Sequence, residues 1–203
     1  TGARTRVEAS ECAFEAGIVT SDQTLGSFGG GAIYATLGAT IVLNDSIVRG
    51  NLAGRDGGGI MMFDESALFL KNSLIERNWA ASDGGGLYGA SSTTFNAPRS
   101  IKVIDSIIKY NFAGGNLDLT ALESGSGGGA YFRFCRAVNF TNSSVQGNLA
   151  YSNGGGITLH ERSVAHFRRT SISDNVAGPE SIEATNTSSV YTKSILQSGN
   201  GGG

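Results

Sequence analysis

The chain has 203 residues, the length of a single domain, and a net charge of −2 that does not favour generic nucleic-acid binding. Its 31 glycines are about twice the average usage, whereas it has only 2 prolines and 16% charged residues. No apolar run reaches the ~18 residues that a membrane-spanning helix needs, and 2 cysteines are too few for a disulfide scaffold. We therefore expect no transmembrane segment in this sequence, and the placement of the glycines becomes the informative feature.

The glycines fall in triplets that recur along the chain. The intervals between them are 28, 27, 43, 27 and 47 residues, and the triplets begin at Gly29, Gly57, Gly84, Gly127, Gly154 and Gly201. A period near 27 residues is typical of a solenoid, and the two longer intervals indicate insertions. We expect one solenoid over residues 1–203, a section of a longer protein, with full coils at 29–56, 57–83, 84–126, 127–153 and 154–200 and loop insertions at 90–99, 116–126 and 178–200.

Further columns repeat with the same period after each of the first five triplets. An alanine lies two residues after a recurring asparagine, a Ser or Thr lies five residues before it, and a Val or Ile lies three before it. The asparagines are Asn51, Asn78, Asn111, Asn148 and Asn175, and the hydroxyl residues are Ser46, Ser73, Ser106, Ser143 and Thr170. This agreement predicts that every coil follows the same backbone path.

The segments between these columns have the period of β-strands. Stretches such as 67–70 and 101–103 are interpreted as having a two-residue period, the segments are rich in β-branched residues, and no segment in the repeat shows a helical stripe. Each coil has room for three short strands: one after the triple glycine, one near 67–71, and one from the serine to the asparagine. The sequence therefore predicts an all-β fold, a single-stranded, right-handed, three-sided parallel β-helix with coils about 4.8 Å apart.

The columns then acquire structural roles. The asparagines should form a ladder at a bend, because Asn tolerates left-handed backbone and its amide can bond the coils above and below. The glycines should supply another bend, where positive φ or close approach excludes a Cβ. Inward stacking is expected for Ala32, Ile60, Leu87, Ala130 and Ile157 in one column, and for Leu43, Leu70, Val103, Phe140 and Phe167 in another.

Two of these motifs together resemble a known repeat. Gly-Gly-Gly-Ile at 57–60 and Gly-Gly-Gly-Leu at 84–87 alternate with Ile-Glu-Arg-Asn at 75–78 and Ile-Ser-Asp-Asn at 172–175. This pattern resembles the repeat of the chlamydial polymorphic outer membrane proteins, over roughly residues 29–177. It departs from that family because a third glycine often replaces alanine and Val or Ile replaces phenylalanine. The resemblance implies a right-handed β-helix displayed on a surface, often in adhesion.

A basic strip is one candidate binding site. Arg133 and His160 fall at the same position of adjacent coils, Arg162 and further arginines lie nearby, and only Glu161 opposes them. Such cations favour an anionic glycan or an acidic protein surface. The alternative is a solvated face whose neutralising charges lie on loops.

An outward column next to the glycines is a second candidate. Most of its members are apolar or aromatic, which favours stacking on sugar rings or on a protein partner. The alternative is that the inserted loops cover it. The column is Ile33, Met61, Tyr88, Tyr131 and Thr158.

A carbohydrate-active β-helix, a polysaccharide lyase or glycoside hydrolase, is the enzymatic alternative. It requires carboxylates close enough for acid–base chemistry. Asp64 and Glu65 occupy positions equivalent to Glu161, but three coils apart, or roughly 14 Å. That separation is too large for direct cooperation, so we expect no catalytic residues, no metal and no cofactor.

The preferred interpretation is a non-enzymatic, rigid, structural or adhesive segment of an extracellular or cell-surface glycoprotein. Its expected partners are other protein chains, other parts of the same polypeptide, or glycans, with no nucleic acid, and the oligomeric state stays open. Sequons for N-glycosylation occur at Asn44, Asn139, Asn142 and Asn186.

Overall fold

The structure is a computed structural model that describes residues 5–20, 29–91, 100–115 and 125–178. Over these residues the chain forms 23 strands and no helix, and the strands pair in parallel. No described segment is therefore a helix able to cross a membrane. Of the predicted insertions at 90–99, 116–126 and 178–200, residues 92–99, 116–124 and 179–200 lie outside the described residues, as do the last triplet at Gly201 and the sequon at Asn186.

The strands form four sheets, named here A to D. Sheet A contains β1 (Arg6–Ser10), β5 (Thr40–Asn44), β9 (Ala67–Lys71), β13 (Ser100–Ile104), β17 (Val138–Thr141) and β21 (Ala165–Arg168). Sheet B contains β2 (Ala13–Glu15), β6 (Ile47–Arg49), β10 (Leu74–Glu76), β14 (Ile107–Lys109), β18 (Ser144–Gln146) and β22 (Ser171–Ser173). Sheet C contains β3 (Ile18–Val19), β7 (Leu52–Ala53), β11 (Trp79–Ala80), β15 (Phe112–Ala113), β19 (Leu149–Ala150) and β23 (Val176–Ala177). Sheet D contains β4 (Ile33–Ala35), β8 (Ile60–Phe63), β12 (Leu87–Ala90), β16 (Ala130–Arg133) and β20 (Ile157–His160).

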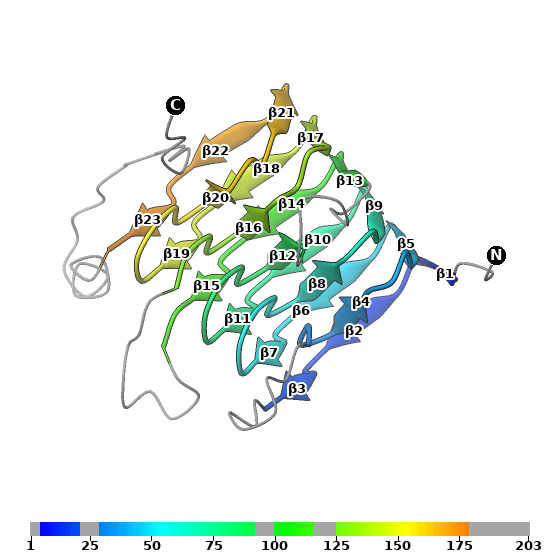
Figure 1. The fold of residues 1–203 in the computed structure, drawn as a ribbon, viewed down its shortest axis with the longest axis horizontal. Coiled ribbons are helices and arrows are strands. Elements are labelled where there is room, and N and C mark those ends of the chain that lie inside the picture. Colours follow the sequence, from blue (N-terminus) through cyan, green and yellow to red (C-terminus); the bar gives the residue numbers. More distant parts are fainter. Residues whose placement is uncertain (1–4, 21–28, 92–99, 116–124, 179–203) are drawn as a thin grey trace.

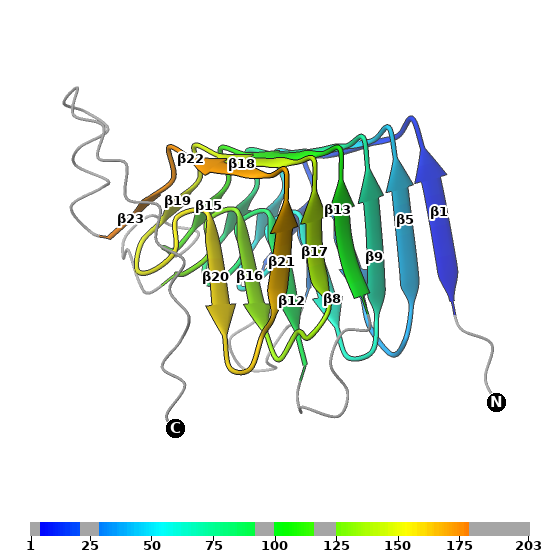
Figure 2. The same cartoon turned by 90° about the horizontal axis from the view of Figure 1, so that it is seen from above.

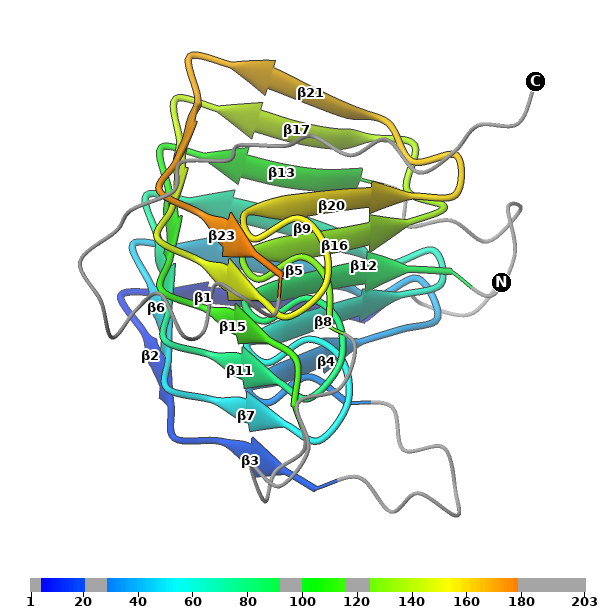
Figure 3. The ribbon, with the colours of Figure 1, turned by 90° about the vertical axis from the view of Figure 1, so that its left-hand side faces the viewer.

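Each coil passes through sheets D, A, B and C before the chain rises to the next coil. Within every sheet the neighbours are strands from successive coils (Figure 1). Sheet A lies as a row of parallel strands along the axis (Figure 2), and the ribbon encloses the space between the sheets (Figure 3). The predicted parallel β-helix is confirmed.

The number of strands per coil differs from the expectation of three. The strand predicted to run from the serine to the asparagine ends at Glu76, before a corner at Arg77 whose φ is +52°, and a further strand follows the asparagine. The corner separates β10 from the two-residue strand β11, which is too short to show an alternating pattern. A fourth sheet is therefore present, with the recurring alanine of the repeat facing inward: Ala53, Ala80, Ala113 and Ala150 are fully buried.

The first coil is also displaced by one residue relative to the predicted alignment. Ile33 pairs with Ile60 and Tyr34 pairs with Met61. The amides of Ala32 and Ile33 both donate to the Gly59 carbonyl, which marks one extra residue in this coil. Ile33, not Ala32, therefore occupies the inward column, and Tyr34, not Ile33, occupies the outward one.

A single hydrophobic core fills the solenoid. The predicted column on sheet A is in register, Leu43 with Leu70 and Phe140 with Phe167, and the last two rings stack at 5.2 Å. Ile60, Leu87 and Ile157 close the core from sheet D. Burial of an aliphatic side chain contributes about 1.5–3 kcal/mol, so the stacked columns are a large source of stability.

The asparagine ladder is continuous through the core-facing corner between sheets B and C. Asn78 Oδ1 accepts from the backbone N–H and the Nδ2 of Asn51, at 3.0 and 2.9 Å. Its own Nδ2 donates to the Val48 carbonyl and to Asn111 Oδ1, at 3.0 and 2.9 Å. The pattern repeats at Asn111 and Asn148 and ends on Asn175. Each buried amide thus satisfies backbone groups that the corner leaves unpaired.

The hydroxyl column forms a second ladder, at the corner between sheets A and B. The backbone N–H of Ser46 donates to Ser73 Oγ, and that of Ser73 donates to Ser106 Oγ, both at 3.0 Å. Each coil therefore uses two side-chain columns to replace hydrogen bonds that its corners remove.

The glycine triplets satisfy both predicted requirements. Gly57 has a φ of +67°, and a Cβ on Gly58 would lie 2.3 Å from the Gly85 carbonyl oxygen and 2.4 Å from the Trp79 backbone. The first position needs a left-handed residue, and the second needs one without a side chain.

Replacing Asn78 by Leu should destabilise the protein by about 3–5 kcal/mol, because it leaves the buried Asn51 N–H and Val48 carbonyl without partners. Denaturant unfolding followed by circular dichroism measures the change. Asn72→Ala, at an exposed corner, is the matched control and should cost about 1 kcal/mol or less. Equal stability of wild type and Asn78→Leu would contradict the ladder's role.

Candidate functional site

The outward face of sheet D carries the aromatic column. Tyr88 and Tyr131 are in register, and their rings stack with centroids 5.4 Å apart and an interplanar angle of 3°. They form a buried cluster with Met61 and Ala90, and only 8% and 7% of the two tyrosines is exposed. Neither ring is open to solvent, as binding to an exposed stripe would require. Thr158 is buried as well, whereas the loops that the alternative places over the column lie largely outside the described residues.

Two aspartates lie in the turns that lead into sheet D. Asp56 and Asp83 immediately precede the glycine triplets of successive coils. The Asp83 N–H donates to Asp56 Oδ1 at 3.2 Å, and the Ser126 N–H donates to Asp83 Oδ1 at 2.8 Å. These bonds form a third ladder and hold successive turns in register.

Burial governs the titration of this region. Desolvation and, to a smaller extent, the negative charge of Asp56 raise the pKa of Asp83 to about 6. The hydrogen bond from the Ser126 N–H and the positive charges of Arg133 and Arg55 lower this pKa, but by less. Desolvation also raises the pKa of Asp56. Desolvation also raises the pKa of Tyr88 and of Tyr131, so both hydroxyl groups stay protonated at neutral pH.

The basic strip begins at the next outward position of sheet D. Arg133 is in register with His160, as predicted. Arg133 also forms a bidentate ion pair with Glu161, with Nε to Oε2 at 2.7 Å and Nη2 to Oε1 at 3.2 Å. This hydrogen bonding raises the pKa of Arg133 and lowers the pKa of Glu161. The pair therefore removes one net positive charge from the strip.

His160 and Arg162 complete the predicted strip. The His160 ring lies 6.1 Å from the Tyr131 ring, and its Nδ1 atom is buried without a hydrogen-bond partner in the described part of the chain. Arg162 is exposed at the following corner, where its φ is +56°. The strip is thus an Arg–Glu pair flanked by a half-buried imidazole and an exposed guanidinium group.

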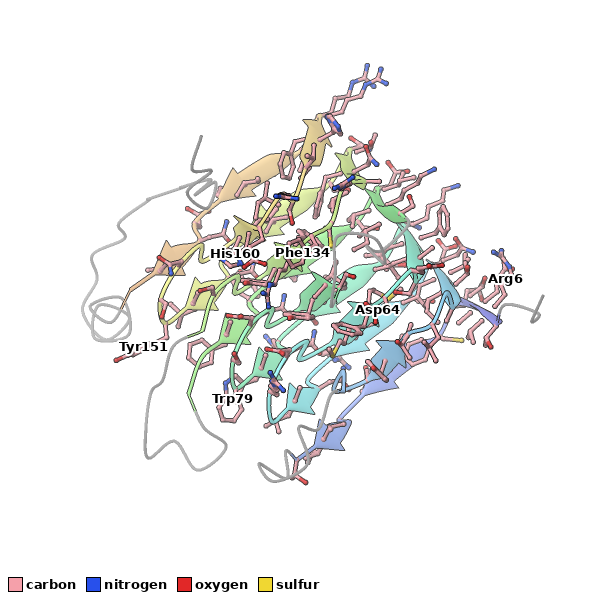
Figure 4. The ribbon with its side chains drawn as sticks, in the orientation of Figure 1. Arg6, Asp64, Trp79, Phe134, Tyr151 and His160 are labelled. Atoms are coloured by element: carbon pink, nitrogen blue, oxygen red, sulfur yellow. The ribbon has the colours of Figure 1, made fainter. Side chains whose placement is uncertain are left out.

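The carboxylates considered for catalysis do not meet. Asp64 accepts a 3.0 Å hydrogen bond from Ser91 Oγ on the next coil. Glu161 lies several coils further along the solenoid. Its carbonyl oxygen accepts a hydrogen bond from the N–H of Phe134, which belongs to the coil before it. Figure 4 accordingly shows His160 near Phe134, with Asp64 farther along the solenoid. No three His, Cys, Asp or Glu side chains within the described ranges gather as metal ligands.

Asp56 and Asp83 were not predicted from the sequence, although a signal was present. Both residues stand directly before a glycine triplet, and the equivalent positions hold Ser126 and Asn153. A recurring polar residue that precedes a turn is a typical backbone-capping pattern. The two aspartates come close to the tyrosines and to Arg133 only because the turns between sheets C and D fold back beside sheet D. The local sequence pattern does not show this.

The described sequons lie along one side of the coil. Asn44 and Asn139 are half-buried on strands of sheet A, and Asn142 is exposed at the following corner. The Nδ2 of Asn142 donates to Asp105 Oδ1 at 2.6 Å.

The two cysteines are free. Cys12 is exposed and Cys135 is buried. The Cys135 thiol donates to the Gly89 carbonyl at 3.2 Å, and burial raises its pKa to about 12, so it is a packing residue.

Comparisons with protein-family models, with curated protein sequences and with solved structures find no match. The fold assignment therefore depends on the strand pairing itself.

Replacing Asp83 by Asn should stabilise the protein at pH 7.5. The carboxyl group is harder to ionise in the folded chain than in the unfolded chain, so its ionisation opposes folding above pH 6 and this effect disappears below about pH 4. The shift corresponds to about 1–3 kcal/mol. Thermal unfolding of both proteins from pH 4 to 7.5 measures it, and a difference that does not grow with pH would contradict a raised pKa.

Proposed function

We propose that this chain is a rigid, non-enzymatic scaffold segment of an extracellular or cell-surface protein. The observation that carries the proposal is the unbroken asparagine ladder from Asn51 to Asn175, which makes consecutive coils one mechanical unit. Solenoids of this type present long, fixed surfaces, and such a surface suits structural support or adhesion.

The chemistry of sheet D supports recognition over catalysis. Arg133 and Glu161 neutralise each other, Asp83 Oδ1 is occupied by a backbone N–H, and the tyrosines are buried. Arg162, beside His160, is an exposed cation of the strip. We infer that this end of the strip contacts an anionic glycan or an acidic protein surface.

Two further features favour a surface location. The three described sequons are on or beside sheet A, away from the core, where oligosaccharides can be attached without unfolding a coil. The repeat also resembles that of the chlamydial polymorphic outer membrane proteins, a family displayed on surfaces. Labelling of intact cells of the source organism with an antibody to these coils tests the location, and labelling only after permeabilisation would contradict it.

A carbohydrate-active enzyme is the second candidate, and one observation favours it. Asp56 and Asp83 are carboxyl groups on adjacent coils, and Asp83, with a pKa of about 6, holds a proton close to neutral pH, as catalytic acids do.

One experiment separates the two functions. Wild-type protein is incubated with neutral and uronic-acid-containing polysaccharides, and new reducing ends, unsaturated products and binding are measured. The scaffold proposal predicts no product, together with binding of the acidic polymer that falls at least fivefold in Arg162→Glu and stays unchanged in the control Arg6→Glu. Product formation that Asp83→Asn abolishes would establish the enzyme instead, and binding insensitive to Arg162→Glu would contradict the proposed strip.

A further inference from the structure

The outer face of sheet B carries two columns of side chains in register across its first four strands. One column is apolar, and the other alternates in charge. Strand pairing aligns them coil by coil. The apolar column is Ala13, Ile47, Leu74 and Ile107, and the charged column is Glu15, Arg49, Glu76 and Lys109; we call these eight residues the sheet B array.

The charged column is a ladder of ion pairs. Arg49 contacts Glu15 at 2.6 Å and Glu76 at 3.9 Å, and Lys109 contacts Glu76 at 3.5 Å. Glu15 and Arg49 keep 41% and 44% of their side chains exposed. Along the axis the signs therefore read negative, positive, negative, positive, at a spacing of about 4.8 Å.

The apolar column beside it is partly open to solvent. Ala13 is exposed, Ile47 and Leu74 are half-buried, and Ile107 is 39% exposed. The ion-pair ladder explains why the charges alternate, but it does not explain an apolar column on the same flat face. A contiguous apolar surface with a charged border is typical of a protein-protein contact.

The order of charges makes the array complementary to itself. Consider two copies that face each other across a two-fold axis, which runs parallel to the strands of sheet B and passes midway between Arg49 and Glu76. The order of the coils is then reversed in the second copy. The apolar column of one copy still faces the apolar column of the other, and the charged column faces the charged column. Arg49 then faces Glu76 of the second copy, and Glu15 faces its Lys109. In the apolar column, Ile47 faces Leu74 and Ala13 faces Ile107.

The neighbouring corners fit this arrangement with one exception. Gly50 leaves room for Arg77 of the second copy, and Asp45 faces Asn72, whose amide can donate to it. Glu11 faces Asp105, a like-charge pair at each end of the contact.

A two-fold axis along the solenoid would instead place the apolar column against the charged column.

We propose that the sheet B array is a homodimer interface, in which two copies of this chain pack face to face and antiparallel. The proposal is independent of the surface-scaffold function. The array spans only four coils, well below the roughly 1,600 Å² of a standard interface, so the expected dissociation constant is about 10–500 μM.

Charge reversal tests the register directly. Lys109→Glu places a negative charge opposite Glu15 of the second copy, and should weaken association at least tenfold. The double variant Lys109→Glu with Glu15→Lys should restore it, because all four facing pairs are again opposite in sign. Within one chain the double variant brings no such relief, since it places the introduced lysine beside Arg49 and the introduced glutamate beside Glu76. Rescue can therefore come only from the intermolecular contact.

Sedimentation equilibrium from 5 μM to 1 mM measures association, with circular dichroism to verify folding. Ile107→Glu should also give monomer, whereas the control Lys71→Glu, on sheet A, should dimerise like wild type. Wild-type protein that stays monomeric at 1 mM would overturn the proposal. A wild-type dimer that Ile107→Glu leaves intact, or that the double variant does not restore, would overturn this interface and its register.

Discussion

The fold depends on one constraint: each coil must turn sharply four times without leaving buried backbone groups unpaired. The corner between sheets B and C solves this with a buried asparagine whose amide bonds two coils at once. Because each asparagine also accepts from the preceding one, no coil satisfies its corner alone. The hydrophobic core supplies most of the driving force for folding, but it is non-directional, and the ladder fixes the register in which the coils stack.

The predictable part of the structure is the part that repeats. The asparagine, hydroxyl and glycine columns recur in the five coils that the first five triplets begin, and each proves to occupy a corner. Errors arise where a single coil departs from the repeat or where a strand is too short to alternate. The extra residue before Ile33 shifts one alignment, and the two-residue strand β11 has no period to detect.

The candidate site is less predictable than the fold, for a physical reason. Register follows from counting along the sequence, so the prediction that Arg133 and His160 lie side by side is confirmed. Exposure and pairing depend on what packs against a position from outside the coil. Tyr88 and Tyr131 face outward and are nevertheless buried, and the Asp56–Asp83 pair reaches them only through the turn between sheets C and D.

The central claim is that the ladder makes the coils one cooperative unit, and amide hydrogen exchange tests it most directly. The backbone N–H groups of Asn51, Asn78, Asn111 and Asn148 each donate to the next asparagine side chain. If the ladder holds the solenoid together, all four should exchange only by global unfolding, with a shared free energy equal to that from denaturant. Exchange through separate local openings, with free energies well below the global value, would contradict it.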